Sequence, residues 1–239
     1  AGAGRARAMV ICPPWGHEYL RAHRSLRVLA DRLNETALHT LRFDYFGTGD
    51  SAGDMDEADL AGWEADIETA IEELRDTTEL NSVGLVGLRL GATLAARVAA
   101  RRRDIHSLVL WDPVPSGAEF LGELEAQHSS QMGSLESALR PEGRSGIQLL
   151  GFAMSREMRK QLLDLDLWAQ IDKWPKRTLA VVSAAAPACA EVRSRLESRG
   201  AGLGEFAAVD APPAWVEHQG SGAGAIPVPV IDRIVAWCK

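Results

Sequence analysis

Short apolar runs rich in β-forming residues alternate along this chain with longer amphipathic stretches. This alternation is typical of a mostly parallel sheet with helices on both faces, which places the chain in the α/β class. The expected strands are 9–12, 38–43, 82–86, 105–111, 178–183 and 205–209. The expected helices are 20–33, 57–75, 92–102, 189–199 and 226–238. A chain of 239 residues fits one domain of this kind.

The alternation stops between residues 114 and 171. This stretch contains helical patterns and polar loops but no convincing strand. It is far longer than the roughly two to six residues that usually join a strand to a helix. We interpret residues 114–171 as an inserted helical lid, and residues 1–113 and 172–239 as the α/β core.

Composition excludes several classes of function. The net charge of −7 argues against a protein that binds the phosphate backbone of nucleic acids. No run reaches the roughly 18 apolar residues of a membrane span, and the first residues do not resemble a signal peptide, so a cytoplasmic protein is expected. The three cysteines have no metal-ligand spacing, and no dinucleotide-type phosphate loop is present. We therefore expect no metal and no cofactor.

A tight turn separates the third expected strand from its helix, in the sequence Gly87-Leu88-Arg89-Leu90-Gly91. Glycines flank the central residue, as a sharp turn packed closely on its neighbours requires. A second loop, 13–18, follows the first strand and reads PPWGHE, and a third, 42–51, reads RFDYFGTGDS. His218 is the only histidine in the loop before the final helix.

Together these motifs resemble the α/β-hydrolase superfamily over nearly the whole chain. They are most similar to a bacterial branch, related to serine-aminopeptidase-like proteins, that has G-x-R-x-G at this turn. The resemblance implies that Arg89 stands at the serine of the G-x-S-x-G nucleophile elbow. It also implies that loop 13–18 supplies an oxyanion-hole N–H, that loop 42–51 is mostly structural, and that His218 occupies the place of the triad base.

Two departures from the family limit what the resemblance implies. The guanidinium of Arg89 stays protonated and cannot attack a carbonyl, so no acyl-enzyme can form there. The acid expected near residues 184–187 is missing, because that stretch reads AAAP. Asp112 follows strand 105–111, where some members of the superfamily place this acid, and it is a candidate to pair with His218. A His–Asp pair still supports general acid–base chemistry.

The first functional hypothesis is therefore an enzyme covered by a lid. It would hydrolyse a small acyl or carboxylated substrate, or eliminate a carboxylate from it, through His218 with Asp112. Arg89 and the backbone of Trp15 and Leu90 would bind negative charge. Three further candidates for lining the substrate site are His17, Glu18 and Asp44, and each has a structural alternative. The first two would hydrogen-bond within their loop, and Asp44 would stabilise a turn.

The second hypothesis is a catalytically inactive hydrolase-like protein that binds a ligand or a partner protein. Arg89 would then be a structural plug paired with Asp44, Asp112 or Glu18. The expected signs are a filled pocket, a salt-bridged Arg89 and a His218 turned to solvent. A third hypothesis is a substrate bound to an acyl carrier protein that docks on basic lid residues. These residues are Arg140, Arg144, Arg156, Arg159 and Lys160. A homodimer is also left open.

Overall fold

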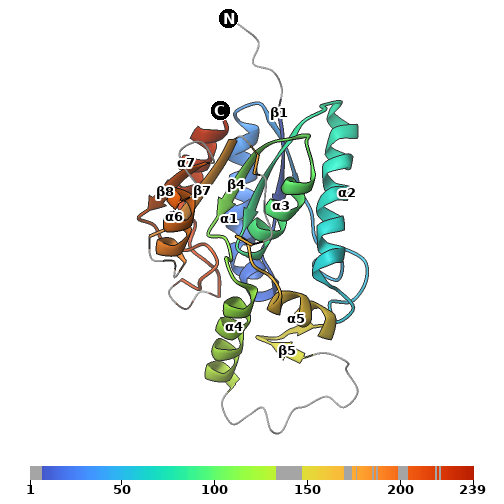
Figure 1. Ribbon diagram of the computed structural model, residues 1–239, viewed down its shortest axis with the longest axis vertical. Helices are drawn as coiled ribbons and strands as arrows, with labels where there is room; N and C mark the ends of the chain where they lie inside the picture. Colours follow the sequence, from blue (N-terminus) through green and yellow to red (C-terminus); the bar gives the residue numbers. More distant parts are fainter. Residues whose placement is uncertain are drawn as a thin grey trace, which may run out of the picture.

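A single parallel sheet of six strands organises the computed structural model (Figure 1), which describes residues 7–132, 147–169, 174–175, 177–184, 186, 188–198, 204–218, 220 and 222–239. The strand order is β2-β1-β3-β4-β7-β8, and every neighbouring pair is parallel. The strands are β1 (Arg7–Cys12), β2 (Leu38–Arg42), β3 (Val83–Leu88), β4 (Ile105–Trp111), β7 (Arg177–Ser183) and β8 (Glu205–Val209). This sheet confirms the α/β class that the alternating pattern predicts.

Helices cover both faces of the sheet. They are α1 (Gly16–Asn34), α2 (Leu60–Thr78), α3 (Leu90–Arg101), α6 (Cys189–Ser198) and α7 (Val228–Cys238). One buried apolar cluster joins the sheet to α2, α3 and α6, and a second joins the opposite face to α1 and α7 (Figure 1). Because β3 lies in the middle of the sheet between these layers, all six of its residues are buried. This burial explains its continuous apolar sequence.

The stretch between β4 and β7 contains two helices, α4 (Gly117–Met132) and α5 (Arg156–Leu163), at one end of the molecule (Figure 1). It also contains a two-stranded antiparallel hairpin of β5 (Ile147–Leu149) and β6 (Phe152–Met154). The expectation that this region has no strand was therefore wrong. Residues 133–146 and 170–171 of the expected lid lie outside the described residues.

Two side chains fasten this region to the start of α2. Gln161 Oε1 accepts hydrogen bonds from the backbone N–H groups of Leu60 at 2.8 Å and Ala61 at 3.1 Å. These donors belong to the first turn of α2 and have no partner within their own helix. Ser155 donates to the Ala58 carbonyl at 2.6 Å. The insertion is thus anchored to the core by polar contacts as well as by apolar packing. Within the described ranges, none of the helices has the length and apolar character that crossing a bilayer requires.

Candidate functional site

Arg89 forms the turn between β3 and α3 by itself. Its backbone has φ 54° and ψ −123°, a conformation that residues other than glycine rarely adopt. A Cβ atom on Gly87 would overlap the backbone of Ala92, and one on Gly91 would overlap the carbonyl of Pro13. The two glycines thus let α3 pack tightly against β3 and the end of β1. This packing fixes the sharp elbow and directs the Arg89 side chain to the carboxyl end of the sheet.

The Arg89 side chain is buried, with 4% of its surface exposed, and it is paired on two sides. Its Nε donates to Glu18 Oε1 at 2.9 Å, and its Nη2 donates to Glu123 Oε2 of α4 at 3.1 Å. The guanidinium carbon lies 3.9 Å from the ring centroid of Trp215 and 5.3 Å from that of Phe120. Burial lowers the pKa of Arg89, but the two carboxylates outweigh it and raise this pKa above its ordinary value. The nucleophile position therefore holds a permanently charged group that is almost completely buried.

Glu18 is the acidic partner of Arg89 in the interior. Its side chain is 2% exposed and lies in the first turn of α1, where the helix dipole favours a negative charge. Burial raises the pKa of Glu18, and the charge of Arg89 opposes this shift. Glu18 Oε2 has no hydrogen-bond partner in the described part of the chain. The carboxylate therefore depends on Arg89 for most of its stabilisation.

Asp112 lies at the end of β4 with φ 44°, and it is buried. Its Oδ1 accepts from the backbone N–H of Ser183 at 2.6 Å. Its Oδ2 accepts from the Ser183 hydroxyl at 2.8 Å and from Trp215 Nε1 at 3.2 Å. These donors occupy both oxygens of the carboxylate. Sequence reasoning missed both partners, although Trp215 lies only three residues before His218.

His218 is exposed, and its backbone N–H donates to the carbonyl of Ala223 at 2.9 Å. Ser183 and Trp215 donate the hydrogen bonds that Asp112 accepts, so the pairing of Asp112 with His218 stays a prediction. Arg89 and Asp112 do lie near each other, because the Asp112 charge contributes to raising the pKa of Arg89. The structure thus brings Arg89 and Asp112 to the indole of Trp215 and Glu18 to Arg89, and His218 is an exposed residue.

The other predicted site residues divide between two places. Trp15 and Leu90 are buried beside the elbow, at the starts of α1 and α3, and Trp15 packs edge-on against Phe152 of the hairpin at 5.8 Å. Asp44 stabilises its own loop instead, since its carboxylate accepts from the Tyr19 hydroxyl at 2.5 Å and from the backbone of Asp50 at 3.1 Å. These bonds favour the structural role that the sequence analysis gave as its alternative.

His17 lies in α1, which begins at Gly16, four residues earlier than the expected start at residue 20. His17 and Glu18 therefore belong to a helix and not to the expected loop. Burial lowers the pKa of His17 to about 4, and the charges of Arg21 and Arg89 lower it further in the same direction. His17 is thus neutral near pH 7, and its Nδ1 is buried without a hydrogen-bond partner in the described structure.

Lowering the pH from 7.5 to 4.5 is expected to reduce the free energy of unfolding of the wild type and, to a smaller extent, of a His17→Gln variant. The loss in the wild type should be larger by about 2 kcal/mol. The folded-state pKa of about 4 lies below the ordinary value of 6.5, so the folded protein binds fewer protons than the unfolded chain between these values. The stability contributed by neutral His17 is complete above pH 6.5 and is lost as the pH falls. Urea unfolding at several pH values measures the difference. His39→Gln, at an exposed position of β2, is the control and should follow the wild type. Equal losses of stability in the wild type and in His17→Gln would refute the lowered pKa of His17.

The space beside the elbow is small. A cavity of about 100 Å³ is bounded by Arg89, Phe120 and three carboxylates, those of Glu119, Glu123 and Glu191. Pockets for small-molecule ligands usually measure about 300 to 1,000 Å³. Within the described residues, no cluster of histidine, cysteine and acidic side chains could hold a metal ion. The described residues therefore leave only a small space beside Arg89.

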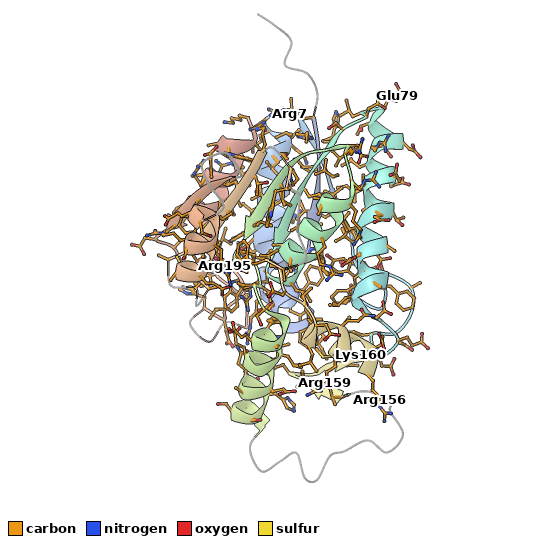
Figure 2. The ribbon with its side chains drawn as sticks, viewed as in Figure 1. Arg7, Glu79, Arg156, Arg159, Lys160 and Arg195 are labelled. Atoms are coloured by element: carbon orange, nitrogen blue, oxygen red, sulfur yellow. The ribbon has the colours of Figure 1, made fainter. Side chains whose placement is uncertain are left out.

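The basic lid residues that the sequence suggested for carrier-protein docking are described in part. Arg156, Arg159 and Lys160 lie on α5, at the same end of the molecule as α4 (Figure 2). Arg159 pairs with Glu125 of α4 at 3.2 Å, and Lys160 lies 3.9 Å from Glu157. Arg140 and Arg144 lie outside the described residues.

The sheet order, the crossover helices and the strained elbow together define an α/β-hydrolase fold. Solved structures confirm this fold. Est1E from Butyrivibrio proteoclasticus, with bound ferulic acid, is 16% identical with a TM-score of 0.67, over 98% of this chain and 87% of that one. A monoacylglycerol lipase from Paleococcus ferrophilus is 17% identical with a TM-score of 0.65, over 96% and 93% of the two chains. The Pyrococcus furiosus esterase PF2001 is 14% identical with a TM-score of 0.64, over 98% and 81%. No family model and no curated protein matches the sequence.

Proposed function

We propose that this chain is a hydrolase-fold protein whose elbow site is closed, and that it acts by binding a ligand or a partner protein without acyl-transfer catalysis. The observation that carries this proposal is the buried ion pair of Arg89 and Glu18 beneath the indole of Trp215. An arginine supplies no nucleophile, and here it also supplies no open anion site. The motif G-x-R-x-G supports placing the chain in the bacterial branch that the sequence resembles.

Energetics argue against the use of Arg89 to hold a substrate carboxylate. Such a substrate would have to displace Glu18 from Arg89 Nε or Glu123 from Nη2. Displacing Glu18 would leave a buried carboxylate without its partner, which typically costs about 3 to 5 kcal/mol. The carboxylate of the substrate would gain the same interaction with Arg89 that Glu18 had lost. Exchange of one carboxylate for another therefore gives no net binding energy at this position.

Esterase assays separate the closed-site proposal from the acid–base hypothesis. The wild type is expected to show no covalent labelling by a fluorophosphonate probe, because the elbow has no hydroxyl or thiol. It is also expected to hydrolyse 4-nitrophenyl acetate and butyrate no faster than His218→Ala and Arg89→Met variants. General acid–base catalysis contributes about 10²- to 10⁴-fold. A loss of this size in His218→Ala, with an unchanged melting temperature, would overturn the proposal in favour of His-based catalysis.

A further inference from the structure

A second, larger groove lies at the opposite end of the sheet from the elbow. It measures about 750 Å³ and is formed where α3 ends and where β4 and β7 begin. The amino ends of the parallel strands lie at the same end of the molecule as this groove. Figure 2 shows this end by the label of Arg7, at the start of β1, far from the labelled residues of α5. The side chains of the groove that matter here are Arg101, Arg102, Arg103, His106, Trp174 and Arg177. Among the described residues that line it, none is an aspartate or a glutamate.

Two of the four arginines are already neutralised. Arg101 and Arg102, at the end of α3, form ion pairs with acidic residues that lie on α2 or directly before β4. Their partners are Glu64, Glu68, Glu72 and Asp104. These pairs fix one wall of the groove and leave little net charge there.

The other two arginines have no carboxylate partner in the described structure. Arg103 is exposed and makes neither an ion pair nor a side-chain hydrogen bond there. Arg177 donates to the backbone carbonyl of Trp237 at 2.8 Å, and its guanidinium carbon lies 4.8 Å from the centre of that indole ring. A carbonyl and a ring orient this guanidinium without cancelling its charge. Arg103 has no ion pair among the described residues, and Arg177 is attracted only weakly to Glu205, a carboxylate that already pairs with Arg233. Both guanidinium groups therefore keep most of their positive charge in the groove, in a chain whose net charge is −7.

A β-bulge brings a third polar group to the groove. The register of β3 and β4 passes from Val83 opposite Ile105 to Gly84 opposite Ser107, so His106 is the extra residue. Bulges turn a side chain away from its regular direction, and they are frequent next to functional sites. The Nδ1 atom of His106 is buried and has no hydrogen-bond partner in the described part of the chain. Because this atom has almost no accessible surface, the imidazole contributes to the wall of the groove and not to direct ligand binding.

We propose that this groove binds a small ligand that carries a phosphate group, with Arg103 and Arg177 on the phosphate oxygens. Guanidinium forks match phosphate oxygens in geometry and charge. The half-buried indole of Trp174 supplies an apolar wall for the rest of the ligand. The groove volume falls in the ordinary range for small-molecule sites. This site is separate from the elbow and does not rest on the function proposed for it.

Calorimetric titration with sodium pyrophosphate, at an ionic strength held constant with sodium chloride, tests the proposal. The wild type should bind pyrophosphate, and the Arg103→Gln/Arg177→Gln variant should bind it at least about tenfold more weakly. Arg103→Gln alone should also weaken binding, and it should fold normally because Arg103 makes no contact that the fold uses. The matched control is Arg195→Gln, which removes the same charge from an exposed position of α6 and should bind like the wild type.

Two results would overturn the phosphate site. One is a wild-type heat no larger than that of sodium chloride at the same ionic strength. The other is an equal loss of affinity in Arg195→Gln and Arg103→Gln, which would mean that only the overall charge matters. A melting temperature measured for each variant without ligand identifies any loss of binding that comes from unfolding.

Discussion

Replacing Glu18 with alanine is expected to lower the free energy of unfolding by about 3 kcal/mol. Arg89 cannot release its proton, so the variant would retain a positive charge in a site that is 4% exposed, with Glu123 as its remaining carboxylate partner. Glu123 is itself 38% exposed and compensates only in part. Urea unfolding at pH 7.5, followed by circular dichroism, measures this loss.

Arg89→Met removes the other member of the ion pair, and the stability of this variant is expected to depend on pH in a different way. Burial already raises the pKa of Glu18, and removal of Arg89 takes away the charge that opposes this shift. An acid with a raised folded-state pKa binds more protons in the folded protein than in the unfolded chain. The Arg89→Met variant should therefore become more stable as the pH falls from 7.5 toward 4.5, the ordinary pKa of a glutamate. Glu18→Ala lacks this carboxylate, so protonation of residue 18 cannot stabilise it.

A double-mutant cycle built from Glu18→Met, Arg89→Met and the double variant gives the coupling between the two residues. Replacing both with methionine is expected to leave stability within about 1 kcal/mol of the wild type, since apolar pairs often substitute for buried ion pairs without loss. If the costs of the two single substitutions instead add up in the double variant, the residues do not interact and the closed-site interpretation fails.

Truncation of Trp215 to alanine is expected to cost about 4 kcal/mol. The indole is 6% exposed, stacks on the guanidinium of Arg89 at 3.9 Å and donates to Asp112 at 3.2 Å. Its removal would lose apolar packing, a cation–π contact and a hydrogen bond to a buried carboxylate at once. The same urea unfolding experiment reports the difference.

Trp215→Phe is the matched variant, because it keeps one aromatic ring for contact with Arg89 and removes the indole N–H together with the second ring. It should cost about 1 to 2 kcal/mol. Free indole added to Trp215→Ala should refill the vacated space and raise its melting temperature, with no effect on the wild type. A loss below about 1 kcal/mol in Trp215→Ala would show that the indole does not seal the elbow.

The sequence predicted the sheet well, because buried parallel strands are short continuous apolar runs between helical stretches. It missed the β5–β6 hairpin, since strands of three residues are too short to display an alternating pattern. It also placed the start of α1 too late. The residues Gly16, His17 and Glu18 carry no strong apolar period, and tertiary burial decides that they belong to the helix.

The elbow could be predicted from its two glycines, but the partner of its central residue could not. The sequence offered Asp44, Asp112 and Glu18 as partners for Arg89. Glu18 is selected by the pairing of β1 with β3, which brings the starts of α1 and α3 to the same edge of the sheet. Glu123 was missed because the direction of α4 depends on how the segment between β4 and β7 packs on the sheet. The Trp215 contact depends on the path of a long loop before α7, which local patterns do not determine.

The backbone conformation of the elbow would suit a serine nucleophile at position 89. The conformation at position 89 is set by the neighbouring glycines and by the approach of α3 to Pro13, so any residue placed there inherits the sharp turn. A serine introduced there would be presented as a nucleophile is, yet it would meet the carboxylate of Glu18 and the indole of Trp215 in the place of a triad base. Engineering an esterase from this scaffold therefore requires no change in the main chain. It requires removal of Glu18 and relocation of an imidazole to the place of the Trp215 indole, introduced together.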